Sequence, residues 1–134
     1  MKKVFVSGQV DDVDCVRKVY KKLELAGFTV THDWTTSDVI LSGREAKLNN
    51  TKEAGLRAEK DINGVVDADV YILLSDNEKV GKGMYAELGA ALALNKRSGR
   101  PDIYIVGSLK HLSVFYLHPA VKLRDTVEDV LNEL

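Results

Sequence analysis

Two acidic residues, Asp61 and Glu87, have the type and placement needed for carboxylate chemistry. Glu87 follows Met84 by three positions and precedes Ala91 by four, so its side chain projects near the apolar, inward face of a predicted helix. Asp61 lies on the helix that leads into the strand before Glu87. Two carboxyl groups that converge can divide a reaction, one attacking carbon and the other handling a proton.

Each acid also has a simpler interpretation. Glu87 lies near the start of its helix, where a negative charge is favoured by the helix dipole. Asp61 lies in a helix rich in charged residues and could be a solvated surface acid. Both alternatives stay open from these residues alone.

Glycine-containing turns follow two of the predicted strands. Ser7, Gly8 and Gln9 follow the first, and Gly81, Lys82 and Gly83 precede the helix that carries Glu87. Glycine allows a ligand to approach the backbone closely. Ligands of open α/β sheets bind beyond the carboxyl ends of the strands, so we expect both turns to face one crevice.

Asp33 and Trp34 end the second predicted strand and have two interpretations. They could form a wall of a nucleobase pocket, with the indole stacking and Asp33 bonding to a base edge. They could equally be a strand end covered by an amphipathic tryptophan. His32, His111 and His118 are too scattered to predict a metal site.

Apolar periodicity predicts strands that alternate with helices. The strands are expected at 4–6, 28–31, 70–74, 102–106 and 121–123. The helices are expected after Asp11 or Asp12 up to Gly27, from Asn50 to about Val66 with Glu53 in a capping box, from Met84 to Gly99, and after Asp125 with Glu128 as its capping partner. Residues 35–49 show no clear period, and 107–118 are expected to be loop.

This alternation predicts an α/β protein with right-handed crossovers. The economical arrangement is a three-layer, doubly wound, five-stranded parallel sheet with the flavodoxin-like order 2-1-3-4-5. Residues 1–134 contain no repeat or linker that suggests a second domain, so we expect a single one.

Composition excludes several classes of function. The net charge of −1 gives no electrostatic case for nucleic acid or an acidic membrane surface. Cys15 is alone, which excludes an internal disulfide and a cysteine-rich zinc site. Lys2 and Lys3 precede an apolar run too short for a signal peptide, so a cytoplasmic location is expected.

The motifs resemble those of the nucleoside 2-deoxyribosyltransferase family, which includes deoxynucleoside 5′-monophosphate N-hydrolases and CMP hydrolases. The resemblance covers most of the chain, while residues 33–58 match poorly. Its motifs are Asp61-Ile-Asn-Gly-Val65, Ala68-Asp69, Gly81-Lys-Gly83 and Glu87-Leu-Gly-Ala-Ala-Leu92.

The resemblance implies a role for each acid. Glu87 matches the nucleophile that attacks C1′ and forms a glycosyl-enzyme intermediate, and Asp61 matches the acid that protonates the departing base. The sugar would pass to water or to a second base. The family needs no metal or organic cofactor. Its substrate is a small nucleoside or its 5′-monophosphate, and it forms homodimers or larger homo-oligomers in which a residue matching Ser113 completes a neighbour's site.

Three positions depart from the family pattern. Phe5 stands where members commonly have a tyrosine that positions the nucleophile, and phenylalanine has no hydroxyl to donate. Gly81 replaces an acid that holds the sugar 5′-hydroxyl, and Gln9 replaces a phosphate-binding serine, although Ser7 is close by. The residues expected to contact substrate are Phe5, Ser7, Gly8, Gln9, Asp33, Trp34, Gly81, Lys82, Gly83 and Ser113.

Other functions fit parts of the pattern. A TIR-type NAD glycohydrolase shares the chemistry and the parallel sheet. A phosphoacceptor receiver domain would use Asp11, Asp12 and Asp76, and Asp76 follows the third strand. A catalytically silent nucleotide-binding module is favoured by Phe5 and Gly81.

Overall fold

The sheet has five parallel strands in the order β2-β1-β3-β4-β5, as predicted. The computed structural model describes residues 2–9, 12–36, 41–79 and 81–134. The strands are β1 (Lys3–Ser7), β2 (Thr29–Val30), β3 (Val70–Leu74), β4 (Asp102–Val106) and β5 (Val121–Arg124). This is the flavodoxin-like α/β arrangement.

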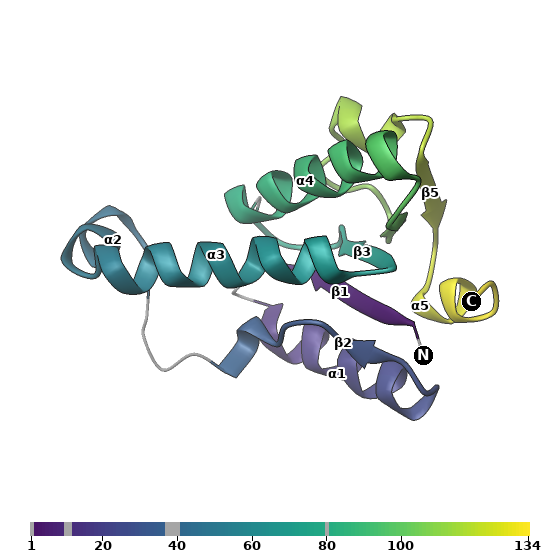
Figure 1. The fold of residues 1–134 in the computed structure, drawn as a ribbon, viewed down its shortest axis with the longest axis horizontal. Coiled ribbons are helices and arrows are strands. Elements are labelled where there is room, and N and C mark those ends of the chain that lie inside the picture. Colours follow the sequence, from purple (N-terminus) through teal and green to yellow (C-terminus); the bar gives the residue numbers. More distant parts are fainter. Residues whose placement is uncertain (1, 10–11, 37–40, 80) are drawn as a thin grey trace.

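Helices cover both faces of the sheet. They are α1 (Val13–Leu25), α2 (Arg44–Asn49), α3 (Thr51–Asp67), α4 (Lys82–Ser98) and α5 (Val127–Leu131), with short 3-10 turns η2 (Trp34–Thr36) and η3 (Val114–Leu117). Figure 1 shows α3 and α4 on one side of β1 and β3, and α1 and α5 on the other. None of the helices in the described ranges is long and apolar enough to cross a bilayer.

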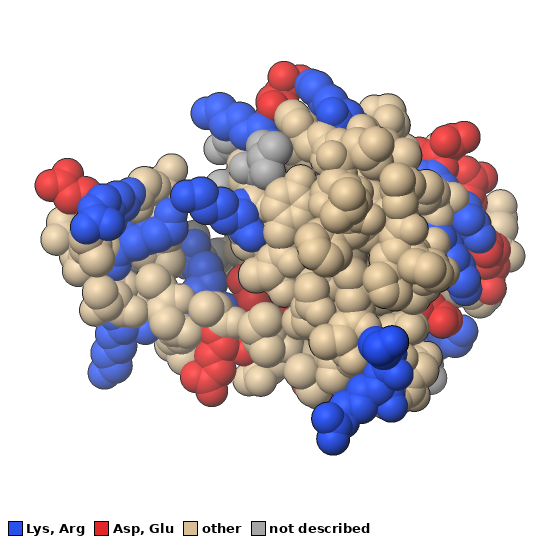
Figure 2. All heavy atoms as spheres, turned by 90° about the horizontal axis from the view of Figure 1, so that it is seen from above, with Lys and Arg blue, Asp and Glu red and all other residues tan. Residues whose placement is uncertain are grey.

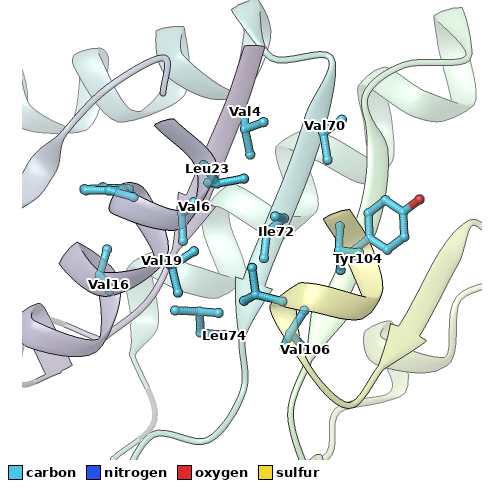
Figure 3. Close-up of a cluster of buried hydrophobic side chains, with 13 residues drawn as sticks. Val4, Val6, Val16, Val19, Leu23, Val70, Ile72, Leu74, Tyr104 and Val106 are labelled. Carbon is cyan, nitrogen blue, oxygen red and sulfur yellow. The ribbon is translucent and has the colours of Figure 1, made fainter. Parts of the chain in front are cut away.

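Alternation along the central strands creates two apolar layers, because successive side chains of a strand point to opposite faces. Val4, Val6, Val70 and Ile72 face α1 and α5, where Leu23 packs among them (Figure 3). The other layer lies under α3 and α4 and contains Phe5, Tyr71, Leu73, Val65, Met84, Leu88, Ala91, Ile103 and Ile105. Both faces of β1 and β3 are thus buried, which explains their continuous apolar sequences.

Gly64 brings α3 close to the sheet. A Cβ at this position would lie 2.8 Å from Cδ2 of Phe5 and 3.0 Å from Cβ of His32. The Gly64 carbonyl also accepts a hydrogen bond from the Thr31 hydroxyl at 2.8 Å. The close approach sets the position of Asp61, which lies one turn earlier on the same helix.

Several helix ends differ from the sequence-based expectation. Asn50 does not cap α3 with its side chain, because its amide donates to the Ala46 carbonyl of the unpredicted helix α2. At α5 the capping box is made by Thr126 and Asp129, one position later than predicted. Asp12 occupies the N-cap of α1 without a side-chain capping bond, and Asp11 lies outside the described residues.

Two further boundaries can be compared. The C-terminus of α4 is as expected, since Gly99 adopts a left-handed conformation with a φ of 81°. The predicted loop 107–118 contains the 3-10 turn η3, which begins where the Ser113 hydroxyl accepts a bond from the Phe115 amide.

Candidate active site

The two acids meet beyond the carboxyl ends of β1 and β3. Glu87 comes from the second turn of α4 and Asp61 from α3, and each is only partly exposed. Their carboxyl groups share a hydrogen bond. The structure therefore brings together the two residues that the sequence singled out.

Ser7 anchors one oxygen of Glu87. The Ser7 side chain is completely buried at the end of β1, and its hydroxyl donates a 2.5 Å hydrogen bond to Oε1. Ser7 Oγ in turn accepts a 2.6 Å hydrogen bond from the Tyr71 hydroxyl of β3. Ser7 was expected to contact substrate; in the structure it supports the carboxyl group from beneath.

The environment raises the pKa of Glu87 from 4.5 to about 8. Burial is the largest cause, because it penalises the charged form. The hydrogen bond from Ser7 opposes this change, while the neighbouring Asp61 carboxyl raises the pKa further. A carboxyl group with such a pKa can hold or release a proton near neutral pH.

Burial also raises the pKa of Asp61, and three neighbours counteract it. They are His32, Arg57 and the hydrogen bond with Glu87, in order of decreasing effect. Nε2 of His32 lies 3.5 Å from Oδ1 of Asp61, too far for a good hydrogen bond. Among the described residues this buried Oδ1 has no hydrogen-bond partner, so it is available to a donor on a ligand.

These effects place one proton between the two carboxyl groups near neutral pH. The pKa of Glu87, raised to about 8, puts this proton on Glu87, and the hydrogen bond between the carboxyl groups favours the same arrangement because it raises the pKa of Glu87 and opposes the rise in the pKa of Asp61. Its transfer across the same hydrogen bond would give an ionised Glu87 opposite a protonated Asp61. That form combines a nucleophile with a general acid.

The glycine loop lies beside the second oxygen of Glu87. A Cβ at Gly83 would lie 4.0 Å from Oε2 of Glu87, which is an ordinary van der Waals distance. A Cβ at Gly81 would lie 3.4 Å from Oε1 of Gln9. The two glycine-containing turns therefore lie together, and exposed Lys82 starts α4 at their edge.

Trp34 and Asp33 make contacts typical of a covered strand end. The indole N–H donates to the Val6 carbonyl at 2.9 Å, and Oδ1 of Asp33 accepts bonds from the amide and hydroxyl of Thr35. Gly8 lies under the indole, where a Cβ would come within 2.7 Å of Val16 Cγ2. These contacts hold Trp34 and Asp33 in place beside the end of β1.

Ser113 lies apart from the two acids, in an apolar groove of about 490 Å³. The groove is lined by Tyr85, Leu88, Gly89, Leu112, Ser113 and Phe115. Successive helical residues are about 100° apart, so Leu88 and Glu87 lie on different faces of α4.

Two functional candidates, Tyr71 and His32, were not assigned site roles from the sequence. Tyr71 is part of an apolar strand, where its pattern indicates core packing. Its sequence signal is the pairing of β1 with β3, which sets Tyr71 beside Phe5 at the position where the resemblance expects a hydroxyl. The sequence assigns His32 no role beyond excluding it from a metal site, and in the structure it lies two residues after β2, which borders β1.

The structure gives less support to a receiver-like site at Asp76 and to a metal site. Asp76, the acid of the receiver alternative, accepts bonds from the Ser108 amide and hydroxyl. Within the described ranges, no three His, Cys, Asp or Glu side chains are grouped so that they could hold a metal ion.

Comparison with known proteins shows a shared fold. No family model matches the chain, and no curated protein matches it significantly. Among solved structures it is similar to the Clostridium botulinum CMP N-glycosidase BcmB, with a TM-score of 0.60 and 15% identity over 98% of this chain and 97% of that one. A conserved protein from Enterococcus faecalis V583 has a TM-score of 0.53 and 12% identity over 99% and 96% of the two chains.

Proposed function

We propose that this chain cleaves the N-glycosidic bond of a nucleoside or a nucleoside 5′-monophosphate. The observation that carries the proposal is the pair of hydrogen-bonded carboxyl groups of Asp61 and Glu87 at the carboxyl ends of the strands. The fold shared with a CMP N-glycosidase supports the same class of reaction.

In the first step, an oxygen of ionised Glu87 attacks C1′ of the sugar as the bond from C1′ to the base nitrogen breaks. Protonated Asp61 gives its proton to the departing base, so both electron pairs and the proton are accounted for. The negative carboxylate stabilises the positive charge that develops on the sugar ring. The product is a glycosyl ester on Glu87.

In the second step, water attacks C1′ and the ester bond to Glu87 breaks. Asp61, now a carboxylate, accepts the proton of the attacking water, and both acids return to their starting states. A second nucleobase in place of water would give transfer instead of hydrolysis. We propose hydrolysis or transfer by one shared intermediate.

The unsatisfied Oδ1 of Asp61 supports our placement of the base beside this residue. A buried acceptor without a partner is costly, and a donor on the bound base would relieve that cost. A Cβ at Gly83 would lie 4.0 Å from Oε2 of Glu87, and we propose that the sugar binds on this side of the carboxyl group. The exposed side chain of Lys82 and the nearby amides of Gly81 and Gly83 would then face a 5′-phosphate.

The test is base release from a panel of nucleosides and 5′-monophosphates, with and without an acceptor base. We expect release by the wild-type protein and a loss of at least about 10³-fold in Glu87→Gln, since removal of a nucleophile has effects of this size or larger. Glu24→Gln on the exposed surface of α1 is the matched control. Release that survives in Glu87→Gln would remove Glu87 as the nucleophile.

We also propose that a second copy of the chain covers the groove beside α4. Figure 2 looks onto this side and shows uncharged atoms across its middle, with Lys and Arg mostly at its margin. Leu112, Val114, Phe115 and Leu117 are each more than half exposed there. An isologous dimer would bury such a patch against its own copy.

A further inference from the structure

Three polar groups from three elements form a continuous hydrogen-bonded chain in the candidate site. The Tyr71 hydroxyl of β3 donates to Ser7 Oγ of β1 at 2.6 Å, and the Ser7 hydroxyl donates to Glu87 Oε1 of α4 at 2.5 Å. Tyr71 and Ser7 are both completely buried. Neither residue can reach solvent, so each contact depends on the packing of the sheet.

The hydrogen bonds from Tyr71 through Ser7 to Glu87 all run in one direction. A serine hydroxyl carries one proton, and Oγ can accept one from elsewhere. Since Tyr71 donates to Oγ, the serine proton is left for Glu87. Burial holds the pKa of Tyr71 well above 10, so Tyr71 keeps its proton across the whole range in which the carboxyl groups titrate.

The rings of Phe5 and Tyr71 explain how the hydroxyl is aimed. These residues are register partners on adjacent strands, and their rings stack at 6.1 Å between centroids with an angle of 6°. The Tyr71 hydroxyl reaches Ser7, the last residue of β1, so the tyrosine side chain extends toward the carboxyl ends of the strands. The hydroxyl that Phe5 lacks is present one strand away.

We propose that Tyr71 is a positioning residue that acts on Glu87 through Ser7. We call the hydrogen bonds from Tyr71 to Ser7 and from Ser7 to Glu87 the relay. The relay fixes Oε1 in place and presents Oε2 to the sugar carbon, a role that rests on the proposed function. It also donates a proton toward the carboxylate, which favours the ionised form that attacks carbon. Adjacent hydrogen bonds strengthen one another in a buried chain, so the loss of Tyr71 weakens the contact made by Ser7.

Other titratable groups also face Glu87. Asp61 faces it from α3, while Tyr71 on β3 and Tyr20 on α1 are close enough to feel its charge. Behind Asp61 lie His32 and Arg57. The relay must therefore be tested by changes at Ser7 and Tyr71 that leave all of these charges in place.

A direct test is carbon-13 NMR of the protein labelled at glutamate carboxyl groups, with Glu87→Gln used to assign the Glu87 signal. Ser7→Ala should raise the pKa of Glu87 by about one to two pH units, the size expected for one hydrogen bond to a charged group. Tyr71→Phe should raise it by a smaller amount. Tyr71→Phe keeps the ring that stacks on Phe5, which limits damage to the fold.

The matched control is Tyr104→Phe, a buried tyrosine on β4 in the opposite apolar layer. It should leave the Glu87 titration unchanged. A Glu87 titration that is the same in Ser7→Ala, Tyr71→Phe and wild type would overturn the proposal. The measurement needs no substrate, so it separates the relay from the proposed function.

Steady-state kinetics add a second readout. In Tyr71→Phe we expect kcat for base release to fall with little change in KM, and the alkaline limb of the pH profile, which reports the pKa of about 8, to move to higher pH. If the wild-type protein releases no base, the proposed function fails while the NMR titration still decides the relay. If base is released and Tyr71→Phe leaves kcat and the pH profile unaltered, the relay is wrong and the function stands.

Discussion

His32 Nε2 lies 3.5 Å from Asp61 Oδ1, so the end of β2 brings a titratable ring against the acid carried by α3. A protonated imidazole lowers the pKa of Asp61, while Asp61 raises the pKa of Glu87. The protonation states of Asp61 and Glu87 are therefore linked. Such linked groups titrate as a unit, and the apparent pKa values of the reaction belong to that unit.

Base release should have a bell-shaped pH dependence. As pH rises through about 8, the two carboxyl groups lose their shared proton and no general acid remains. At low pH both are protonated, and Glu87 cannot attack. Initial rates measured over the range in which the protein stays folded test this. A rate that keeps rising above the pKa of about 8 would contradict the shared-proton arrangement.

Glu87→Gln should remove part of the pH dependence of stability. The pKa of Glu87 is raised in the folded state from 4.5 to about 8, so its contribution to stability is complete below 4.5 and is lost as pH rises through 8. The wild-type protein should lose on the order of 3–5 kcal/mol from this group over that interval, and glutamine should lose none.

Urea unfolding of both proteins below pH 4.5 and above pH 8 measures this difference. Asp61 is present in both proteins, and its pKa is also raised, so it contributes to the pH dependence of both. The informative quantity is therefore the difference between the two proteins in how the free energy of unfolding changes with pH. If the free energy of unfolding changed with pH equally in the wild-type and Glu87→Gln proteins, Glu87 would titrate at its ordinary pKa.

Gly64→Ala should disturb both the fold and the site. The added Cβ would lie 2.8 Å from the Phe5 ring, so α3 must shift, at a cost of about 1–3 kcal/mol. Because α3 carries Asp61, base release should fall as well. Thermal unfolding and initial rates give the two readouts.

Gly55→Ala is the matched control for this substitution. Gly55 lies on the same helix, and among the described residues a Cβ there would meet nothing within 4 Å beyond its own stretch of helix. Alanine should stabilise the helix by roughly 0.5–1 kcal/mol and leave activity unchanged. A Gly64→Ala protein as stable and active as Gly55→Ala would show that α3 does not depend on the close approach.

Phe115→Glu should convert a dimer to a monomer. The side chain is 56% exposed in the apolar patch beside α4, and a charge buried in an interface without a partner opposes association. Sedimentation velocity measures the mass in solution. Leu25→Glu changes an 81% exposed leucine on α1 and should leave the mass unaltered. A wild-type protein that sediments as a monomer would refute the second copy at this face.

The sheet could be predicted because burial of strands on both faces leaves continuous apolar runs. The strand order 2-1-3-4-5 is confirmed. Helix α2 could not be predicted, since none of its residues is buried and its sequence therefore carries no apolar period. The caps were less certain for a local reason: Thr126 and Asp125 are both good capping residues, and only the backbone decides between them.

The site was predictable in part. The face of its helix on which each acid lies follows from the helical period alone. The strand order then brings the helices of Asp61 and Glu87 together. The relay through Tyr71 could not be predicted, because a tyrosine in an apolar strand gives no sign of where its hydroxyl ends. That depends on the register of β1 against β3, which places Ser7 next to it.

Trp34 is the chain's single tryptophan, and its indole is bonded to the Val6 carbonyl directly before Ser7. Its ring also lies over Gly8 at the entrance to the strand ends. The tryptophan fluorescence of the protein therefore originates at one place, near the end of β1 that carries Ser7. Quenching or a spectral shift upon addition of a nucleotide would report occupancy in real time, with no label and no turnover required.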